Sequence, residues 1–153
     1  MAATSFWYGN AVLNQWGTTA ANQVQWTGDT LQVTLHSNTY SPAQDTHDFF
    51  DDATNELGTA GGYTAGGVTL SGKTATYDGP TNTVRLKAND VTWTAFDPTT
   101  AARYAVFWKN TAGAASTDPL IGYMNFGADQ DPGGLDFTVK GDATDGFFRA
   151  VVS

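Results

Sequence analysis

The most informative part of the sequence spans residues 45–78 and reads DTHDFFDDATNELGTAGGYTAGGVTLSGKTATYD. Its glycines give the backbone the freedom that tight turns need. Val68 and Leu70 alternate with polar residues before Ser71-Gly72, and Ala75 and Tyr77 do so after it. Alternation on both sides of a short turn predicts a β-hairpin, so this stretch indicates a β-rich protein.

The same alternation continues on both sides of this stretch. Strands are predicted at residues 30–36, 67–71, 73–78, 83–87, 91–97, 104–110, 120–126, 135–140 and 147–152. They recur about every 8–12 residues, and turn residues separate them, as in sandwiches and barrels. We therefore predict a mainly β fold over residues 1–153, a single antiparallel β-sandwich or barrel-like domain. A short helix over residues 8–16 and one helical turn near residues 46–52 complete it.

Aromatic residues predict how the core is filled. The 153 residues include five Trp and nine Phe, which supply much apolar area without any Cys. Strand alternation predicts that Trp93 and Trp108 point inward, whereas Phe107 points to the opposite face. That second face must then be covered, by the N-terminal helix or by another subunit. His36 falls on the polar side of its strand, so we expect it at the surface.

Charge and termini limit the classes of partner. The formal net charge is −8 with only seven Lys and Arg, which argues against nucleic acid because binding to phosphates needs clustered basic residues. The first residues contain neither a basic signal-peptide region nor a long apolar run. We therefore expect no membrane partner and synthesis in the cytosol.

Candidate catalytic and metal-binding groups are few. Asp45, His47, Asp48, Asp51 and Asp52 have ligand chemistry, but their spacing fits no known metal motif. A solvated acidic turn is the simpler interpretation, and the loop with Asp129 and Asp131 is interpreted in the same way. If a cation were bound, calcium would suit these carboxylates better than zinc. A carboxylate pair of the glycosidase type remains an alternative. No catalytic motif is present, so we expect no catalytic residue, no metal, no cofactor and no enzyme activity.

Exposed aromatic residues offer two further possibilities. Phe6, Trp7 and Tyr8 lie so close to the N-terminus that we expect residues 1–9 to form an arm that contacts a neighbouring chain. Alternatively, Trp7, Trp26 and Tyr63 line a platform for a glycan. Core filling is the simpler explanation for most of the aromatic residues.

Several short segments resemble a family of small tailed-phage virion structural proteins. They are NTYSP (38–42), DTHDFFDD (45–52), YTAGGVTL (63–70), VTW (91–93), ARYAV (102–106), PLIGY (119–123) and FGAD (126–129). The similarity spans about residues 8–140 and carries no site residues. It implies a virion protein, and our leading hypothesis is a capsid decoration protein.

In that hypothesis the chain binds the major capsid protein on the outer capsid surface as a homo-oligomer, with a trimer favoured. Its acidic surface suits a solvent-facing exterior. The alternative is a tail or fibre module that recognises a host glycan or receptor.

Overall fold

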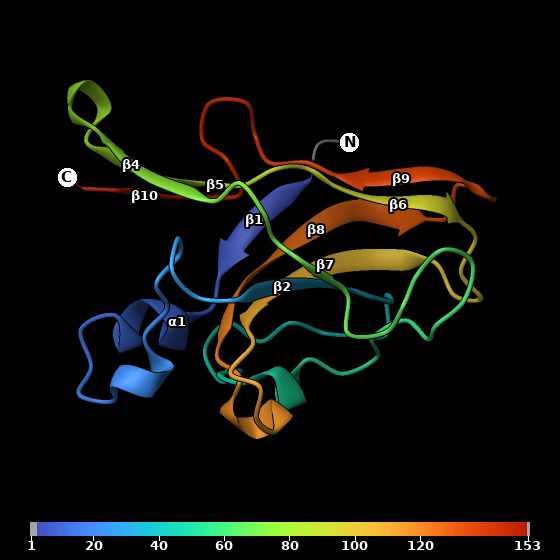
Figure 1. Ribbon diagram of the computed structural model, residues 1–153, viewed down its shortest axis with the longest axis horizontal. Helices are drawn as coiled ribbons and strands as arrows, with labels where there is room; N and C mark the ends of the chain where they lie inside the picture. The colour runs from blue at the N-terminus through green and yellow to red at the C-terminus, as the bar shows by residue number, and fades with distance from the viewer. Residues whose placement is uncertain (1–2, 153) are drawn as a thin grey trace.

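The computed structural model describes residues 3–152, and most of their regular secondary structure is strand (Figure 1). The strands are β1 (Thr4–Trp7), β2 (Leu31–His36), β3 (Val68–Thr69), β4 (Thr74–Asp78), β5 (Thr83–Lys87), β6 (Val91–Phe96), β7 (Ala102–Lys109), β8 (Leu120–Gln130), β9 (Leu135–Val139) and β10 (Phe148–Val151). Helix α1 is Gly9–Asn14, and the 3₁₀ helices are η1 (Ala20–Asn22), η2 (Phe50–Asp52), η3 (Gly79–Thr81) and η4 (Ala115–Thr117). The predicted mainly β fold is confirmed.

A five-stranded antiparallel sheet, in the order β1-β8-β7-β2-β3, forms the centre of the molecule. Its middle strand, β7, has side chains buried on both faces: Ala105 and Phe107 on one, Val106 and Trp108 on the other. Strands covered on both faces are nearly continuous in apolar sequence, which is how this part of the chain reads. The opposite directions predicted for Phe107 and Trp108 are confirmed.

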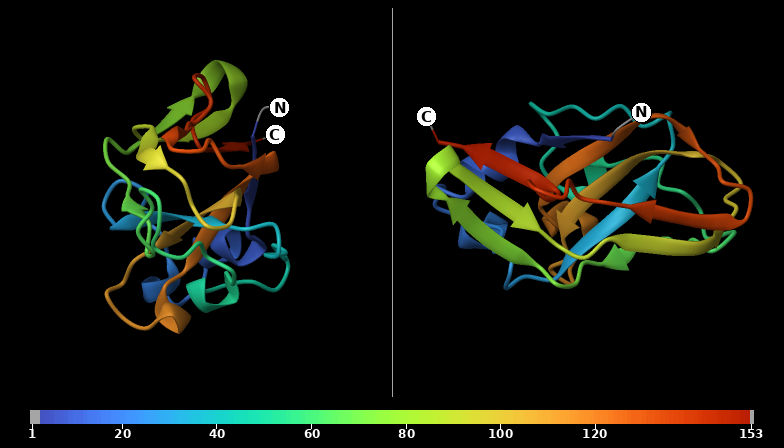
Figure 2. Two further views of the ribbon diagram at one scale, coloured as in Figure 1. Left: turned by 90° about the vertical axis from the view of Figure 1, so that its right-hand side faces the viewer. Right: turned by 90° about the horizontal axis from the view of Figure 1, so that it is seen from above.

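A second layer covers one face of this sheet, and the two layers together resemble a β-sandwich (Figures 1 and 2). It consists of the β6–β9 pair and a three-stranded sheet in the order β10-β5-β4, both antiparallel. The main core lies between the layers and includes Val33, Trp93, Phe96 and Phe107. Trp93 is buried as predicted. Each such side chain contributes about 1.5–3 kcal/mol on burial.

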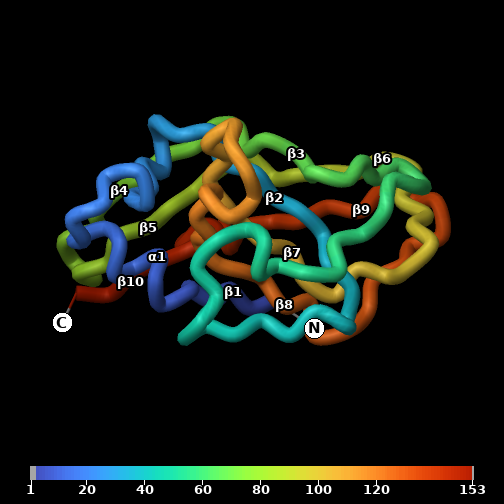
Figure 3. The backbone as a smooth tube through the Cα atoms, turned by 90° about the horizontal axis from the view of Figure 1, so that it is seen from below, coloured from blue at the N-terminus to red at the C-terminus, as the bar shows by residue number. Residues whose placement is uncertain are grey.

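The other face of the five-stranded sheet carries a second apolar cluster. Helix α1 contributes Ala11 to it, and residues 37–57 cross the face as an irregular segment (Figure 3). Within that segment Phe50 stacks on Trp108, with ring centroids 4.1 Å apart. The cover predicted for the Phe107 face is wrong in its position: the second layer covers that face, and helix α1 with residues 37–57 covers the Trp108 face instead.

The hairpin predicted across Ser71-Gly72 is wrong. β3 pairs with β2, not with β4, and β4 pairs with β5. Gly67, at φ 71°, allows this arrangement because a Cβ there would lie 1.9 Å from the Val33 carbonyl oxygen. Local alternation identified both strands, but close contact with β2 decides which strand β3 pairs with.

The surface position predicted for His36 is also wrong, because its side chain is fully buried. Its Nδ1 lies 2.8 Å from the Thr54 carbonyl oxygen, and its Nε2 lies 2.9 Å from the Thr34 hydroxyl. Residues 37–57 cover the face on which alternation placed it, so the face is not solvated. Burial lowers the pKa of His36 to about 4.

Candidate interaction surfaces

The aromatic N-terminal segment is part of the sheet and not a free arm. β1 is an edge strand paired with β8, in which Phe6 lies opposite Tyr123 and Trp7 lies opposite Gly122. Phe6 stacks on Tyr123 with centroids 5.0 Å apart, and Tyr8 is fully buried. The interface expected for Tyr8 is therefore wrong, whereas Phe6 and Trp7 are only partly buried. Residues 1 and 2 of the expected arm lie outside the described residues.

Tyr8 belongs to a buried hydrogen-bond network. Its hydroxyl lies 2.6 Å from that of Tyr40, which in turn lies 3.1 Å from Nδ1 of His47. Burial raises the pKa of Tyr8 far above its ordinary value and raises the pKa of Tyr40 to about 12. Both phenols are therefore protonated near neutral pH, and they serve to fasten residues 40–47 to the sheet.

The aromatic platform proposed for a glycan is not formed. Trp26 is 5% exposed and Tyr63 is 1% exposed. The Trp26 indole N–H donates to the Lys87 carbonyl oxygen at 2.8 Å, and the Tyr63 hydroxyl donates to Glu56 Oε1 at 2.7 Å. Their polar atoms are thus committed to the fold, and of the expected contacts only Trp7 retains a partly exposed ring.

The acidic segment near residues 45–56 is a structural turn. The predicted helical turn is present as η2, at residues 50–52. The Asp48 N–H donates to the Asp52 carboxylate at 3.0 Å and holds the pKa of Asp52 below its usual value, whereas burial raises the pKa of Asp48. Glu56 accepts from the Tyr63 hydroxyl and from the Gly66 N–H at 2.6 Å. These carboxylates organise backbone around them.

The second acidic loop is held in the same way. Asp129 accepts from the Asn38 side chain at 2.7 Å and lies 3.5 Å from Arg103, and Asp131 accepts from the Gly133 N–H. Within residues 3–152, no three His, Asp or Glu side chains converge in a way that could hold a metal ion.

A cleft of about 540 Å³ opens between β1 and residues 140–149. Trp7, Lys140, Asp142, Asp145 and Arg149 are among its lining residues. Asp145 already pairs with Arg149 at 2.6 Å, and Asp142 accepts from the backbone N–H of Asp145. These charged groups stabilise the 142–149 loop, and the cleft brings together no set of free catalytic groups.

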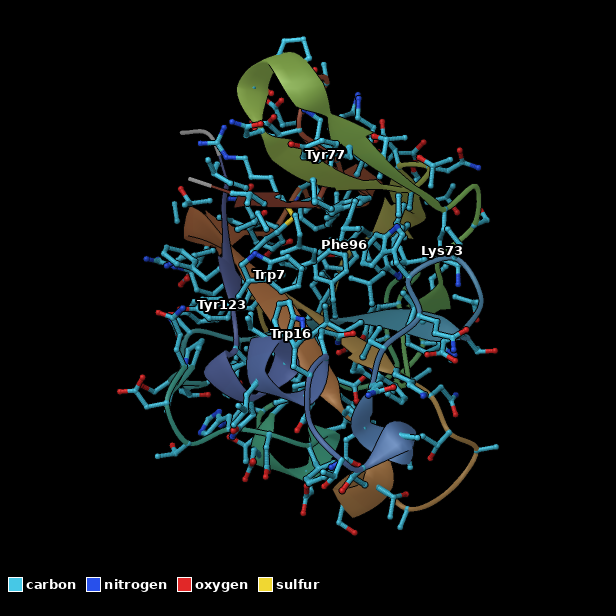
Figure 4. The ribbon with its side chains drawn as sticks, turned by 90° about the vertical axis from the view of Figure 1, so that its left-hand side faces the viewer. Trp7, Trp16, Lys73, Tyr77, Phe96 and Tyr123 are labelled. Carbon is cyan, nitrogen blue, oxygen red and sulfur yellow. The ribbon has the colours of Figure 1, made fainter. Side chains whose placement is uncertain are left out.

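Helix α1 and the β10-β5-β4 sheet lie at the same end of the molecule (Figures 1 and 3), and most of the exposed large apolar side chains belong to this end. Figure 4 shows Trp16 and Tyr77 on this end, with Trp7 between them. Of the eight large apolar side chains exposed in residues 3–152, six belong to this end: Val12 (40%), Leu13 (65%), Trp16 (80%), Tyr77 (60%), Val151 (61%) and Val152 (57%). We refer to these six residues as the apolar end.

Helix α1 contributes Val12 and Leu13 to the apolar end, and Trp16 lies in the bend just after the helix; these three residues are called the α1 patch. Trp16 follows Val12 by four residues and Leu13 by three, the spacings that place side chains on one side of a helix. Ala11 is the buried residue of α1. The sequence predicted an amphipathic helix here but could not tell that its larger apolar side chains face solvent. Helical spacing identifies a stripe and does not identify what covers it.

In comparisons with known proteins, no family model, no curated protein and no solved structure matches this chain. In the part of the chain that the structure describes, no helix has the length and apolar character needed to cross a membrane.

Proposed function

We propose that this chain is a non-enzymatic virion structural protein, a decoration protein that binds the major capsid protein on the capsid exterior and forms a homo-oligomer. The observation that carries the proposal is the α1 patch, in which Trp16 is 80% exposed and Leu13 is 65% exposed. Exposed apolar patches of this kind mark sites of protein–protein contact. The resemblance to virion structural proteins supplies the identity of the partner.

The α1 patch has the composition of an interface centre. Trp is the residue most enriched among those that dominate binding energy, and neighbouring apolar contacts exclude water around it. Burial of an aliphatic side chain of this size contributes about 1.5–3 kcal/mol. Individual contacts of this strength are modest. Repeating them in every copy of an oligomer gives durable attachment to a repeating capsid surface.

Two features support assembly over adhesion or catalysis. Trp26 and Tyr63, which a glycan platform would need, are inside the protein. The acidic groups in the 45–56 segment and in the 129–131 loop hold backbone N–H groups and side chains of the fold. The net charge of −8 also suits a surface that faces solvent and not the packaged genome.

The test compares two charged variants in heads of the virus that encodes this chain. Leu13→Glu with Trp16→Glu places charges in the α1 patch. Leu135→Glu is the matched control, since Leu135 is 70% exposed but begins β9, far from α1 (Figure 1). Purified protein is added to heads that lack it, and the bound fraction is measured by co-sedimentation.

We expect the double variant to lose at least about 100-fold in affinity, because two buried apolar contacts of about 1.5 kcal/mol each are replaced by desolvated charges. The control should bind as the wild type does. Equal binding by all three proteins would overturn the assignment of the α1 patch, and no binding by the wild type would overturn the capsid role.

A further inference from the structure

β10 is an edge strand with an open side. It pairs only with β5, on one of its two sides. The Val152 N–H donates to the Asn82 carbonyl oxygen, so the backbone groups of residues 148, 150 and 152 face β5. Those of Arg149 and Val151 therefore point to the open side. The Trp7 indole donates to the Arg149 carbonyl oxygen at 3.0 Å, which confirms this direction, and that oxygen keeps a second lone pair.

The side chains at this edge are unusual for an edge that remains in water. Val151 and Val152 are 61% and 57% exposed, whereas edge strands in soluble proteins commonly carry Lys, Pro or other protecting residues. β4, the other edge of the same sheet, presents Thr74, Thr76 and Asp78 along its outer face. Tyr77 on β4 is also exposed, but its hydroxyl donates to Asn82 Oδ1 at 2.8 Å, so the two edges differ in that β10 is the one that exposes large aliphatic side chains.

We infer that a second copy of this chain adds its own β10 to this edge, in antiparallel orientation and centred on Ala150. An exchange of one strand for the identical strand is a two-fold contact, the commonest symmetry among homo-oligomers. The open backbone groups of Arg149 then pair with those of Val151 of the second copy. The inference concerns the β10 edge, which is far from the α1 patch in sequence although both belong to the apolar end, and it does not depend on a role in virions.

Charge selects this register. In the pairing centred on Ala150, Arg149 lies opposite Val151 of the second copy. A shift that centres the pair on Arg149 would place two guanidinium groups opposite each other, and like charges directly opposite are destabilising. A shift that centres the pair on Val151 would leave only Val151 paired within β10, whereas the pairing centred on Ala150 places residues 149–151 opposite each other.

The two faces of the pair also match. Residues directly opposite share a face, so Val152 of the second copy lies opposite Phe148, next to the partly exposed Trp7 ring that packs on Phe148, and the two Ala150 methyl groups meet on the same face. On the upper face, the aliphatic stem of Arg149 covers Val151 of the second copy while its guanidinium continues to pair with Asp145. Both exposed valines are thus covered by a single contact.

The test is a pair of opposite charges at one position. Val151→Lys places a cation opposite Arg149 of the second copy, and Val151→Glu places an anion there. Val151 is exposed, so both variants should melt close to the wild-type temperature. Analytical ultracentrifugation should show a dimer for the wild type, a dissociation constant at least about tenfold higher for Val151→Lys, and one no more than about threefold higher for Val151→Glu.

Hydrogen exchange adds a readout of the backbone itself. With rising protein concentration, the amides of Arg149 and Val151 should become protected, while those on the open side of β4 should not. A wild type that stays monomeric would overturn the inference. A dimer or trimer that both variants leave intact would also overturn it. An equal loss of affinity with Val151→Lys and with Val151→Glu would overturn it too, because it would indicate apolar contact without this strand register.

Discussion

At the scale of single residues, the surprising positions are polar groups that lie inside the protein. His36 is buried between β2 and residues 37–57, although strand alternation placed it on a solvated face. Tyr8 is buried together with its hydroxyl, which forms a hydrogen bond with the hydroxyl of Tyr40. Alternation reports two faces of a strand but not what covers each face. A long irregular segment over the second face leaves no periodic signal in the sequence.

The burial of His36 predicts that the protein loses stability in acid. Its pKa is about 4 in the folded protein and about 6.5 unfolded. The unfolded state therefore binds a proton first, and the contribution of His36 is fully present above pH 6.5 and is lost as the pH falls towards 4. We expect the free energy of unfolding to fall about 2–3 kcal/mol more between pH 7 and pH 4.5 for the wild type than for His36→Gln.

Urea denaturation at the two pH values measures this difference, and carboxylates common to both proteins cancel in the comparison. The same pH dependence in both proteins would show that His36 is not held neutral by burial.

At the scale of elements, most strands could be predicted and their partners could not. β5 was predicted to the residue, and the other strands from β4 to β10 were placed within a few residues, because alternation is a local property. β1 was missed because Phe6-Trp7-Tyr8 has no alternation, and it forms because β8 presents an edge. The pairing of β3 with β2 depends on a contact between distant residues. Such contacts leave no mark in a single sequence.

β1 should be a structural strand whose tryptophan stabilises the fold. Trp7 packs on Phe148 with centroids 4.9 Å apart and donates to the Arg149 carbonyl oxygen. We expect Trp7→Ala to lower the free energy of unfolding by about 2–3 kcal/mol, below the cost at a fully buried site. Trp16→Ala is the matched control and should change it by less than about 0.5 kcal/mol, since Trp16 is 80% exposed.

Urea denaturation followed by circular dichroism compares the two tryptophan variants. Equal stability of the two variants would mean that β1 does not depend on Trp7 and would return the N-terminal segment to the role of a free arm.

At the scale of the whole molecule, composition predicted the kind of protein and not its surfaces. Abundant aromatic residues and the absence of Cys predicted a β body stabilised by apolar packing, and two clusters on one sheet are what forms. The apolar end could not be predicted, because its residues lie around α1, in β4 and at the end of β10, segments far apart in the sequence that the fold places at one end of the molecule (Figure 1). The Val151-Val152 pair at the end of the last strand is the single local signal of it.

We have proposed that this chain is a structural component of a virion, held in place through its apolar end. Quantitative mass spectrometry of purified virions from the virus that encodes it tests this most directly. We predict a fixed copy number per major capsid protein, which drops at least about tenfold when the gene carries Leu13→Glu with Trp16→Glu. Absence of the wild-type protein from intact virions would contradict the account.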